Sequence, residues 1–156
     1  MIEGSWSGMK KLLEQEMLCQ ELRGRVTWDL TRFRPAGDEG AVFTVSLNGQ
    51  PIKRFGFQLA AKELRDQGFD IRHVWDIPFE QRDEYTDDEF AEALKTYRNQ
   101  SIGASVGSGN PIVRMFAIVD RRVGARTLEK LRGTIPDQPE WLRRLYEARI
   151  EASINQ

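Results

Sequence analysis

The dipeptide Asn48-Gly49 constrains the fold more than any other feature of the sequence. Both residues tolerate the positive φ angles of a type I′ turn, so the pair is a strong indicator of a β-hairpin. Alternating apolar and polar residues precede it over 41–47, and a short apolar run follows it over 52–55. A similar alternation occupies 26–33, ahead of a polar loop at 35–40. The sequence therefore predicts a three-stranded antiparallel β-meander with one covered face.

Apolar residues at helical spacing surround this predicted meander. Over residues 5–22 they recur every three or four positions, which predicts an N-terminal helix capped by Ser5 or Ser7 and ended near Gly24. Thr86 and Glu89 form the pattern of a capping box, which opens a helix ending near Asn99. The same spacing predicts helices over residues 57–67, 112–122, 125–132 and 140–153.

Two segments between these elements are less regular. Residues 101–109 are rich in glycine and serine and are predicted to form a loop, after which Asn110-Pro111 opens the next helix. The β-branched residues of 112–122 leave a strand open as an alternative there. Residues 69–79 fit either a short strand or a packed loop. The prediction is a single α+β domain spanning residues 1–156, with an N-terminal helix, a three-stranded antiparallel β-meander and a mostly helical C-terminal half.

Composition fits a soluble globular domain. The chain has 156 residues, 40% of them hydrophobic, and this length is typical of one domain. Cys19 is the single cysteine, which excludes an internal disulfide and fits a reducing compartment. No apolar run is long enough to cross a membrane, and the N-terminus lacks the pattern of a secretory signal. We therefore expect a cytoplasmic protein.

Charge is distributed unevenly along the chain. The formal net charge is −1, which disfavours generic binding to nucleic acid. Residues 112–156 carry 9 Lys+Arg and 6 Asp+Glu, whereas residues 76–92 carry eight carboxylates and one arginine, Arg82. This polarity permits electrostatic steering of a partner, although a solvated acidic face is the simpler explanation of the carboxylates.

No pattern of catalytic or metal-binding residues emerges. The glycines at 103, 107 and 109 are not followed by the lysine that a phosphate-binding loop requires. His73 is the only histidine, and nothing in the sequence brings it to Cys19. The acidic residues of 80–89 lack the spacing of a calcium loop. We therefore expect no catalytic residue, no metal and no cofactor.

The densest basic segment is residues 120–128. Arg121, Arg122 and Arg126 lie within six positions at a predicted helix–turn–helix junction, and Asp120 is placed to hold one of them. Guanidinium groups suit carboxylates and phosphates, so these four residues form a candidate binding site for an anion or an acidic partner. The alternative is structural, because arginines near a helix C-terminus also stabilise its free carbonyl groups.

Two segments of the chain resemble a family of short uncharacterised bacterial proteins. The first begins at Trp6 and continues through Leu18-Cys19 to the Gly24-Arg25-Val26 sequence, and the second is Asn110-Pro111 followed by 120–128. Trp141, Tyr146 and Arg149 fit the same pattern. The resemblance implies a bacterial protein, in some cases an accessory or mobile-gene product. It brings no known activity, catalytic residue or cofactor.

Three functions remain open from the sequence. The first is a small non-enzymatic protein–protein interaction or accessory protein, of the kind represented by immunity proteins, with self-association also open. The second is nucleic-acid binding through the helix–turn–helix of 112–132, which the acidic net charge disfavours. The third is an enzyme or binder for a small anionic ligand held by Arg121, Arg122 and Arg126.

Overall fold

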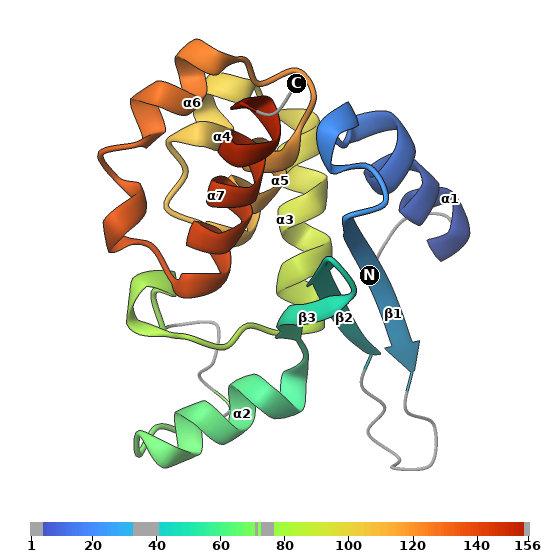
Figure 1. Cartoon of the computed structure of the whole chain (residues 1–156). Helices are drawn as coiled ribbons and strands as arrows, with labels where there is room; N and C mark the ends of the chain where they lie inside the picture. The colour runs from blue at the N-terminus through green and yellow to red at the C-terminus, as the bar shows by residue number, and fades with distance from the viewer. Residues whose placement is uncertain (1–4, 33–40, 71, 73–76, 155–156) are drawn as a thin grey trace.

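The computed structural model describes residues 5–32, 41–70, 72 and 77–154 (Figure 1). Its elements are, in chain order, α1 (Trp6–Lys11), η1 (Leu12–Met17), η2 (Gln20–Leu22), β1 (Val26–Arg32), β2 (Ala41–Leu47), β3 (Gln50–Phe55), α2 (Phe57–Asp66), η4 (Phe79–Gln81), α3 (Asp87–Asn99), α4 (Ile102–Val106), α5 (Pro111–Val119), α6 (Ala125–Leu131), η5 (Ile135–Asp137) and α7 (Glu140–Ile154). The class is α+β, as predicted. An N-terminal helix precedes a three-stranded sheet, and the C-terminal half is mostly helical.

The sheet is an antiparallel meander with strand order β1-β2-β3, which confirms the prediction. Trp28 lies opposite Val45, and Phe43 lies opposite Phe55. In the turn between β2 and β3, Asn48 has a φ of 54° and Gly49 a φ of 82°. Positive φ at both positions is the requirement that made this dipeptide a hairpin indicator.

One face of the sheet contributes to the main hydrophobic core. Phe43 in β2 stacks on Phe90 of α3 with ring centroids 4.3 Å apart. The ring of Trp6 in α1 lies 5.4 Å from the ring of Phe43. Phe55 in β3 contacts both Phe90 and Trp141 of α7. Alternation along the strands therefore places aromatic side chains against α1, α3 and α7.

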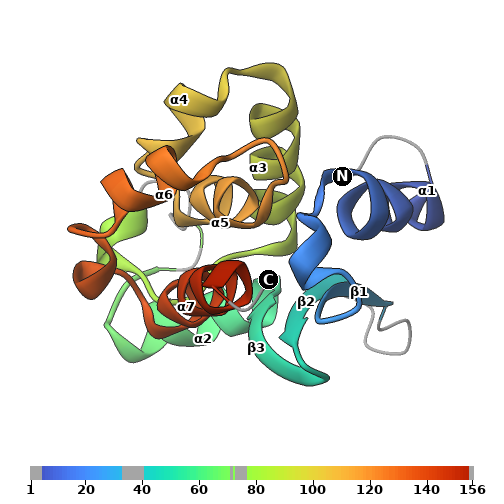
Figure 2. The same ribbon diagram turned by 45° about the horizontal axis from the view of Figure 1, so that its top comes forward.

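Helix α5 lies at the centre of the C-terminal helices, beside α3 and α7 (Figure 2). It is buried along almost its whole length, with Arg114 as its only residue that is not buried. Asn110 caps it by accepting a hydrogen bond from the Ile112 amide at 2.9 Å, and Pro111 occupies its first turn. The segment 112–122 is thus helical up to Val119, and the strand alternative is wrong. Helix α5 therefore sets where the loop that begins at Asp120 starts.

The N-terminal helix is shorter than predicted. Regular α-helix ends at Lys11, a wider π-helical turn follows, and the chain is extended at Leu18 and Cys19. There the Cys19 amide donates to the Val119 carbonyl, and the Arg121 amide donates to the Met17 carbonyl, both at 2.8 Å. Pairing with the end of α5 replaces the hydrogen bonds that a continuous helix would have made, which local spacing could not reveal.

Two further predictions need correction or fall outside the described residues. The predicted loop of 101–109 contains the short helix α4, capped by the Ser101 hydroxyl. The predicted 35–40 loop and His73 lie outside the part of the chain that the structure describes, as does most of 71–76. The capping box of Thr86 and Glu89 is confirmed, and Gly24 has a positive φ of 80°, although the N-terminal helix ends well before it.

Candidate functional site

Asp120 lies directly after α5 and is almost completely buried. Its carboxylate accepts a hydrogen bond from the Tyr97 hydroxyl of α3 and from the Arg122 amide at 2.8 Å. The Arg122 guanidinium adds an ion pair with an N–O distance of 2.7 Å. Burial alone would raise the pKa of Asp120, but the hydrogen bonds from Arg122 and Tyr97 hold this pKa below its ordinary value. Asp120 is therefore a buried, charged anchor for the loop.

Arg149 of α7 secures the other side of this loop. Its guanidinium is buried and donates to the main-chain carbonyls of Ile118, Asp120 and Val123 at distances of 2.7–3.0 Å. These carbonyls lie at and just beyond the C-terminal end of α5, where a cation is favourable. The expected capping of a helix end by arginine is thus performed by Arg149, which the sequence placed only in a family pattern. Its spacing from Leu142 and Leu145 on the inward face of α7 was the available signal.

The candidate residues of 120–128 do not form one cluster. Arg121 and Arg122 line a hollow of about 260 Å³, together with Arg98 at the end of α3 and Leu12, Glu16 and Met17 of η1. Arg126 is the second residue of α6 and is not among the residues that line this hollow. Arg98, which the sequence did not single out, takes its place. We call this hollow, with its six lining residues, the basic hollow.

Charge in the basic hollow is only partly compensated. Asp120 neutralises Arg122, and Glu16 is the only acidic lining residue. Within the described residues, the exposed side chains of Arg98 and Arg121 form no hydrogen bond and no ion pair. Beside them, Leu12 and Met17 are half-buried and supply apolar surface. The hollow therefore presents two free guanidinium groups next to the apolar side chains of Leu12 and Met17.

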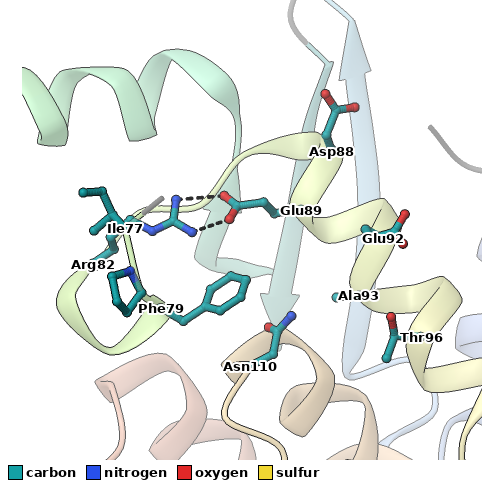
Figure 3. Close-up of a pocket in the computed structure, with 10 residues that line it drawn as sticks. Ile77, Phe79, Arg82, Asp88, Glu89, Glu92, Ala93, Thr96 and Asn110 are labelled. Carbon is teal, nitrogen blue, oxygen red and sulfur yellow. Dashed lines mark hydrogen bonds and ion pairs between the residues drawn. The ribbon is translucent and has the colours of Figure 1, made fainter. Parts of the chain in front are cut away.

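The opposite end of α3 is acidic. A hollow of about 670 Å³ lies there, lined by Asp88 and Glu92 on α3 and by the segment from Ile77 to Phe79 (Figure 3). Figure 3 shows Glu89 reaching toward Arg82, whereas Asp88 and Glu92 point away from that pair. The thirteen residues of α3 span about 20 Å at 1.5 Å per residue, so a single helix separates acidic and basic surfaces.

A buried ion pair stabilises the acidic end. Arg82 and Glu89 form a two-pronged contact, with one N–O distance of 3.0 Å, and both side chains are almost inaccessible to solvent. The guanidinium also lies over the rings of Phe79 and Tyr85, at 5.1 and 5.4 Å from their centroids. Glu89 accepts the Thr86 amide as well, completing the capping box. These contacts fix the start of α3 and leave neither charge of the pair available to a ligand.

The other sequence candidates have structural positions. Cys19 is buried, and this burial raises the pKa of its thiol, which suppresses the reactive thiolate. Gly103 lies inside α4, so the glycine-rich stretch does not form a phosphate-binding loop. In the part of the chain that the structure describes, no three histidine, cysteine or carboxylate side chains are grouped to hold a metal. No helix among these residues has the length and hydropathy needed to cross a membrane.

Fold and site together define an α+β protein in which buried hydrogen bonds hold the loop between α5 and α6. The family model of the SF0329 protein family matches residues 5–150. The chain therefore belongs to the SF0329 protein family. No curated protein and no solved structure matches the chain. The family assignment agrees with the resemblance seen in the sequence.

Proposed function

We propose that this chain is a non-enzymatic binding protein that uses the basic hollow to dock an acidic segment of a protein partner. The observation that carries the proposal is the convergence of Arg98 and Arg121 from two separate elements, with no acidic partner for either within the described residues. Free guanidinium groups at a surface recognise carboxylates in a directional way.

A protein partner explains the hollow better than a small ligand does. The hollow holds about 260 Å³, which is below the usual size of a small-molecule site. Leu12 and Met17 add apolar surface beside the charges, and methionine adapts readily to different partners. Arginine and methionine are both enriched in protein interfaces. The acidic end of α3 adds steering, because it repels the acidic segment from the wrong end of the helix.

Nucleic acid is the alternative that the test must separate. Helices α5 and α6 follow each other across a short turn, as the helix–turn–helix alternative requires, and Arg126 and Lys130 are exposed on α6. However, α6 has only seven residues and also exposes Glu129, and the net charge of the chain is −1. The Glu129 carboxylate and the negative net charge both weaken attraction to phosphate backbones. As part of the same proposal, we place the protein in the bacterial cytoplasm, where an unpaired cysteine stays reduced.

Fluorescence anisotropy with a labelled peptide of six glutamates flanked by leucines tests the proposal. We expect salt-sensitive binding to the wild type, weakened about tenfold or more in the variant Arg98→Gln/Arg121→Gln, equivalent to about 1.4 kcal/mol. The matched control, Arg126→Gln/Arg144→Gln, removes the same charge from exposed positions outside the hollow. Its affinity should stay within about twofold of the wild type, because surface charges away from a contact contribute little.

Three outcomes contradict the proposal. One is the absence of peptide binding at low salt, and another is an equal loss of affinity in the two double variants. The third is tighter binding of a 20-base-pair DNA duplex than of the peptide, with loss in the Arg126→Gln/Arg144→Gln variant. That result would favour the helix–turn–helix function instead.

A further inference from the structure

A third cavity lies beside the acidic hollow of Figure 3 and shares no lining residue with the basic hollow. It has a volume of about 560 Å³ and is lined by residues from three places in the chain: the start of α5, the segment from Phe79 to Tyr85, and the turn from Asp137 to Pro139. Phe79 and Arg82 line both this cavity and the acidic hollow of Figure 3. Its volume is within the range of small-molecule binding sites, and Phe79, Tyr85 and two prolines provide apolar walls.

Arg114 is the unusual group of this cavity. It is the one residue of α5 that is not buried, and its side chain lines the cavity. Within the described residues its guanidinium makes no hydrogen bond and no ion pair, and its Nε is buried without an acceptor. Burial lowers the pKa of Arg114. A half-buried guanidinium without a counter-charge is costly unless a ligand supplies one.

Gln138 supplies a second buried polar atom without a hydrogen-bond partner, and this atom is an acceptor. Gln138 also lines the cavity, and its Oε1 is buried without a donor, while its amide nitrogen donates weakly to the Thr134 carbonyl at 3.4 Å. The Arg114 Nε and the Gln138 Oε1 both have almost no accessible surface, so a ligand in the cavity meets the outer nitrogens of Arg114 and reaches the Gln138 oxygen only if that side chain turns. Buried polar atoms of this kind are rare in folded proteins and point to a missing partner.

The rim of the cavity adds a charge requirement. Glu80, Asp83 and Asp137 line it and are exposed to solvent. Their negative charges repel a multiply charged anion such as phosphate, but they favour a cationic group at the mouth. The interior arginine instead demands an anion. A ligand that suits both regions carries a carboxylate at one end and a protonated amine nearby.

We infer that this cavity binds a small zwitterion of the amino-acid class, with the carboxylate on Arg114 and the ammonium group toward Gln138 and the acidic rim. The carboxylate binds the outer nitrogens of the guanidinium, and the ammonium pairs with the acidic rim and donates to the Gln138 oxygen once that side chain has turned toward the cavity. Apolar walls accommodate the remainder of the molecule. This site is separate from the basic hollow, so it does not depend on the proposed partner.

The probes for the test are the twenty L-amino acids, sodium acetate, methylamine and inorganic phosphate, each titrated into the full chain and followed by thermal shift and calorimetry. At least one amino acid should raise the Tm and show saturable 1:1 binding. Acetate and methylamine should bind at least about tenfold more weakly, because each lacks one of the two contacts. Phosphate should not raise the Tm.

Two variants at the cavity and one control complete the experiment. Arg114→Met should abolish the amino-acid response, and Arg114→Lys should weaken it, because lysine keeps the charge but lacks the two-pronged geometry. Gln138→Leu should weaken binding of the amino acid while leaving the affinity for acetate unchanged. Arg126→Met, an exposed arginine on α6, should behave like the wild type.

The inference is overturned if no amino acid binds, if Arg114→Met binds as well as the wild type, or if phosphate binds more tightly than every amino acid. Circular dichroism of each variant shows whether it is folded. Should Arg114→Met fail to fold, Arg114→Lys and Gln138→Leu still decide the outcome, since an unchanged affinity in both contradicts the assignment.

Discussion

The guanidinium of Arg149 donates a hydrogen bond of 2.9 Å to the main-chain carbonyl of Asp120, while the side chain of Asp120 binds in the other direction, to Tyr97 and Arg122. Arg149 therefore holds the main chain of Asp120, whereas Tyr97 and Arg122 hold its side chain. The buried charges of Arg149 and Asp120 do not form an ion pair with each other. The consequence is a loop whose backbone is fixed between α3, α5 and α7. The rigid presentation of Arg121 depends on this arrangement.

Arg149→Met should strongly destabilise the protein. The substitution removes the Arg149 donor from the buried carbonyls of Ile118, Asp120 and Val123, of which the Asp120 carbonyl still accepts the Val123 amide. Each buried polar group left unpaired costs about 1–3 kcal/mol, so we expect a loss of at least about 2 kcal/mol in the free energy of unfolding. Urea unfolding measures it, with the exposed Arg144→Met as control. A loss below about 1 kcal/mol would contradict the role given to Arg149.

Asp120→Asn should alter the pH dependence of stability. The pKa of Asp120 is lower in the folded protein than in the unfolded chain. Its contribution is therefore complete above the unfolded pKa of about 4, and it disappears as the pH falls through the lower folded value. At pH 7 we expect a loss of about 2 kcal/mol, less than for a fully buried pair because the Arg122 side chain is 55% exposed.

Urea unfolding of Asp120→Asn and wild type from pH 7 down to pH 2 checks this expectation. The difference between the two proteins should shrink below about pH 4, because the wild-type carboxyl then binds a proton as well. Asp137→Asn, at an exposed position, serves as control and should follow the wild type throughout. A difference that grows on acidification would refute the assigned direction.

Glu89→Gln separates the ion pair with Arg82 from the capping box. Glutamine retains an oxygen for the Thr86 amide but leaves the buried Arg82 guanidinium uncompensated. Removing one partner of a buried pair costs about 3–5 kcal/mol. The double variant Arg82→Met/Glu89→Gln should recover part of this loss, since no charge then remains buried. Glu92→Gln, exposed on the same helix, should be near neutral, and additive losses in the double variant would exclude the coupling.

Glu14→Ala should open the outer edge of the sheet. The Glu14 carboxylate accepts the Trp28 amide at 2.8 Å, and Lys10 donates to the Trp28 carbonyl at 2.6 Å, so two side chains of the N-terminal helix occupy the free edge of β1. Removing the acceptor should cost about 1–2 kcal/mol and increase aggregation through the exposed edge. Hydrogen exchange at Trp28 should accelerate at least about tenfold, and Gln15→Ala should leave it unchanged.

Arg114→Met should stabilise the protein in the absence of ligand. The guanidinium has no partner among the described residues, so replacing it with an apolar side chain of similar length removes an uncompensated, half-buried charge. We expect a gain of about 1 kcal/mol, seen as a higher Tm by differential scanning calorimetry. Arg126→Met should show no such gain. Destabilisation by Arg114→Met would indicate that Arg114 has a structural role.

The sequence predicted most elements well because local interactions define their ends. The Asn48-Gly49 turn, the Asn110 cap and the Thr86–Glu89 capping box each depend on groups within a few residues of one another. The N-terminal helix was too long in the prediction because its actual end depends on Val119, about a hundred positions away. Periodicity in one segment carries no information about such a distant hydrogen bond.

The candidate site was only partly accessible to prediction. Asp120 was expected to hold an arginine, and the structure shows Arg122 in that position. The grouping of Arg121 with Arg98, and the lack of a partner for Arg114, depend on how α3 and α5 pack. The sequence by itself determined the α+β class, the hairpin and the helix caps, because backbone angles and capping hydrogen bonds are local. Tertiary structure alone decided which charges meet a partner and which stay free, because burial and counter-charges come from distant segments.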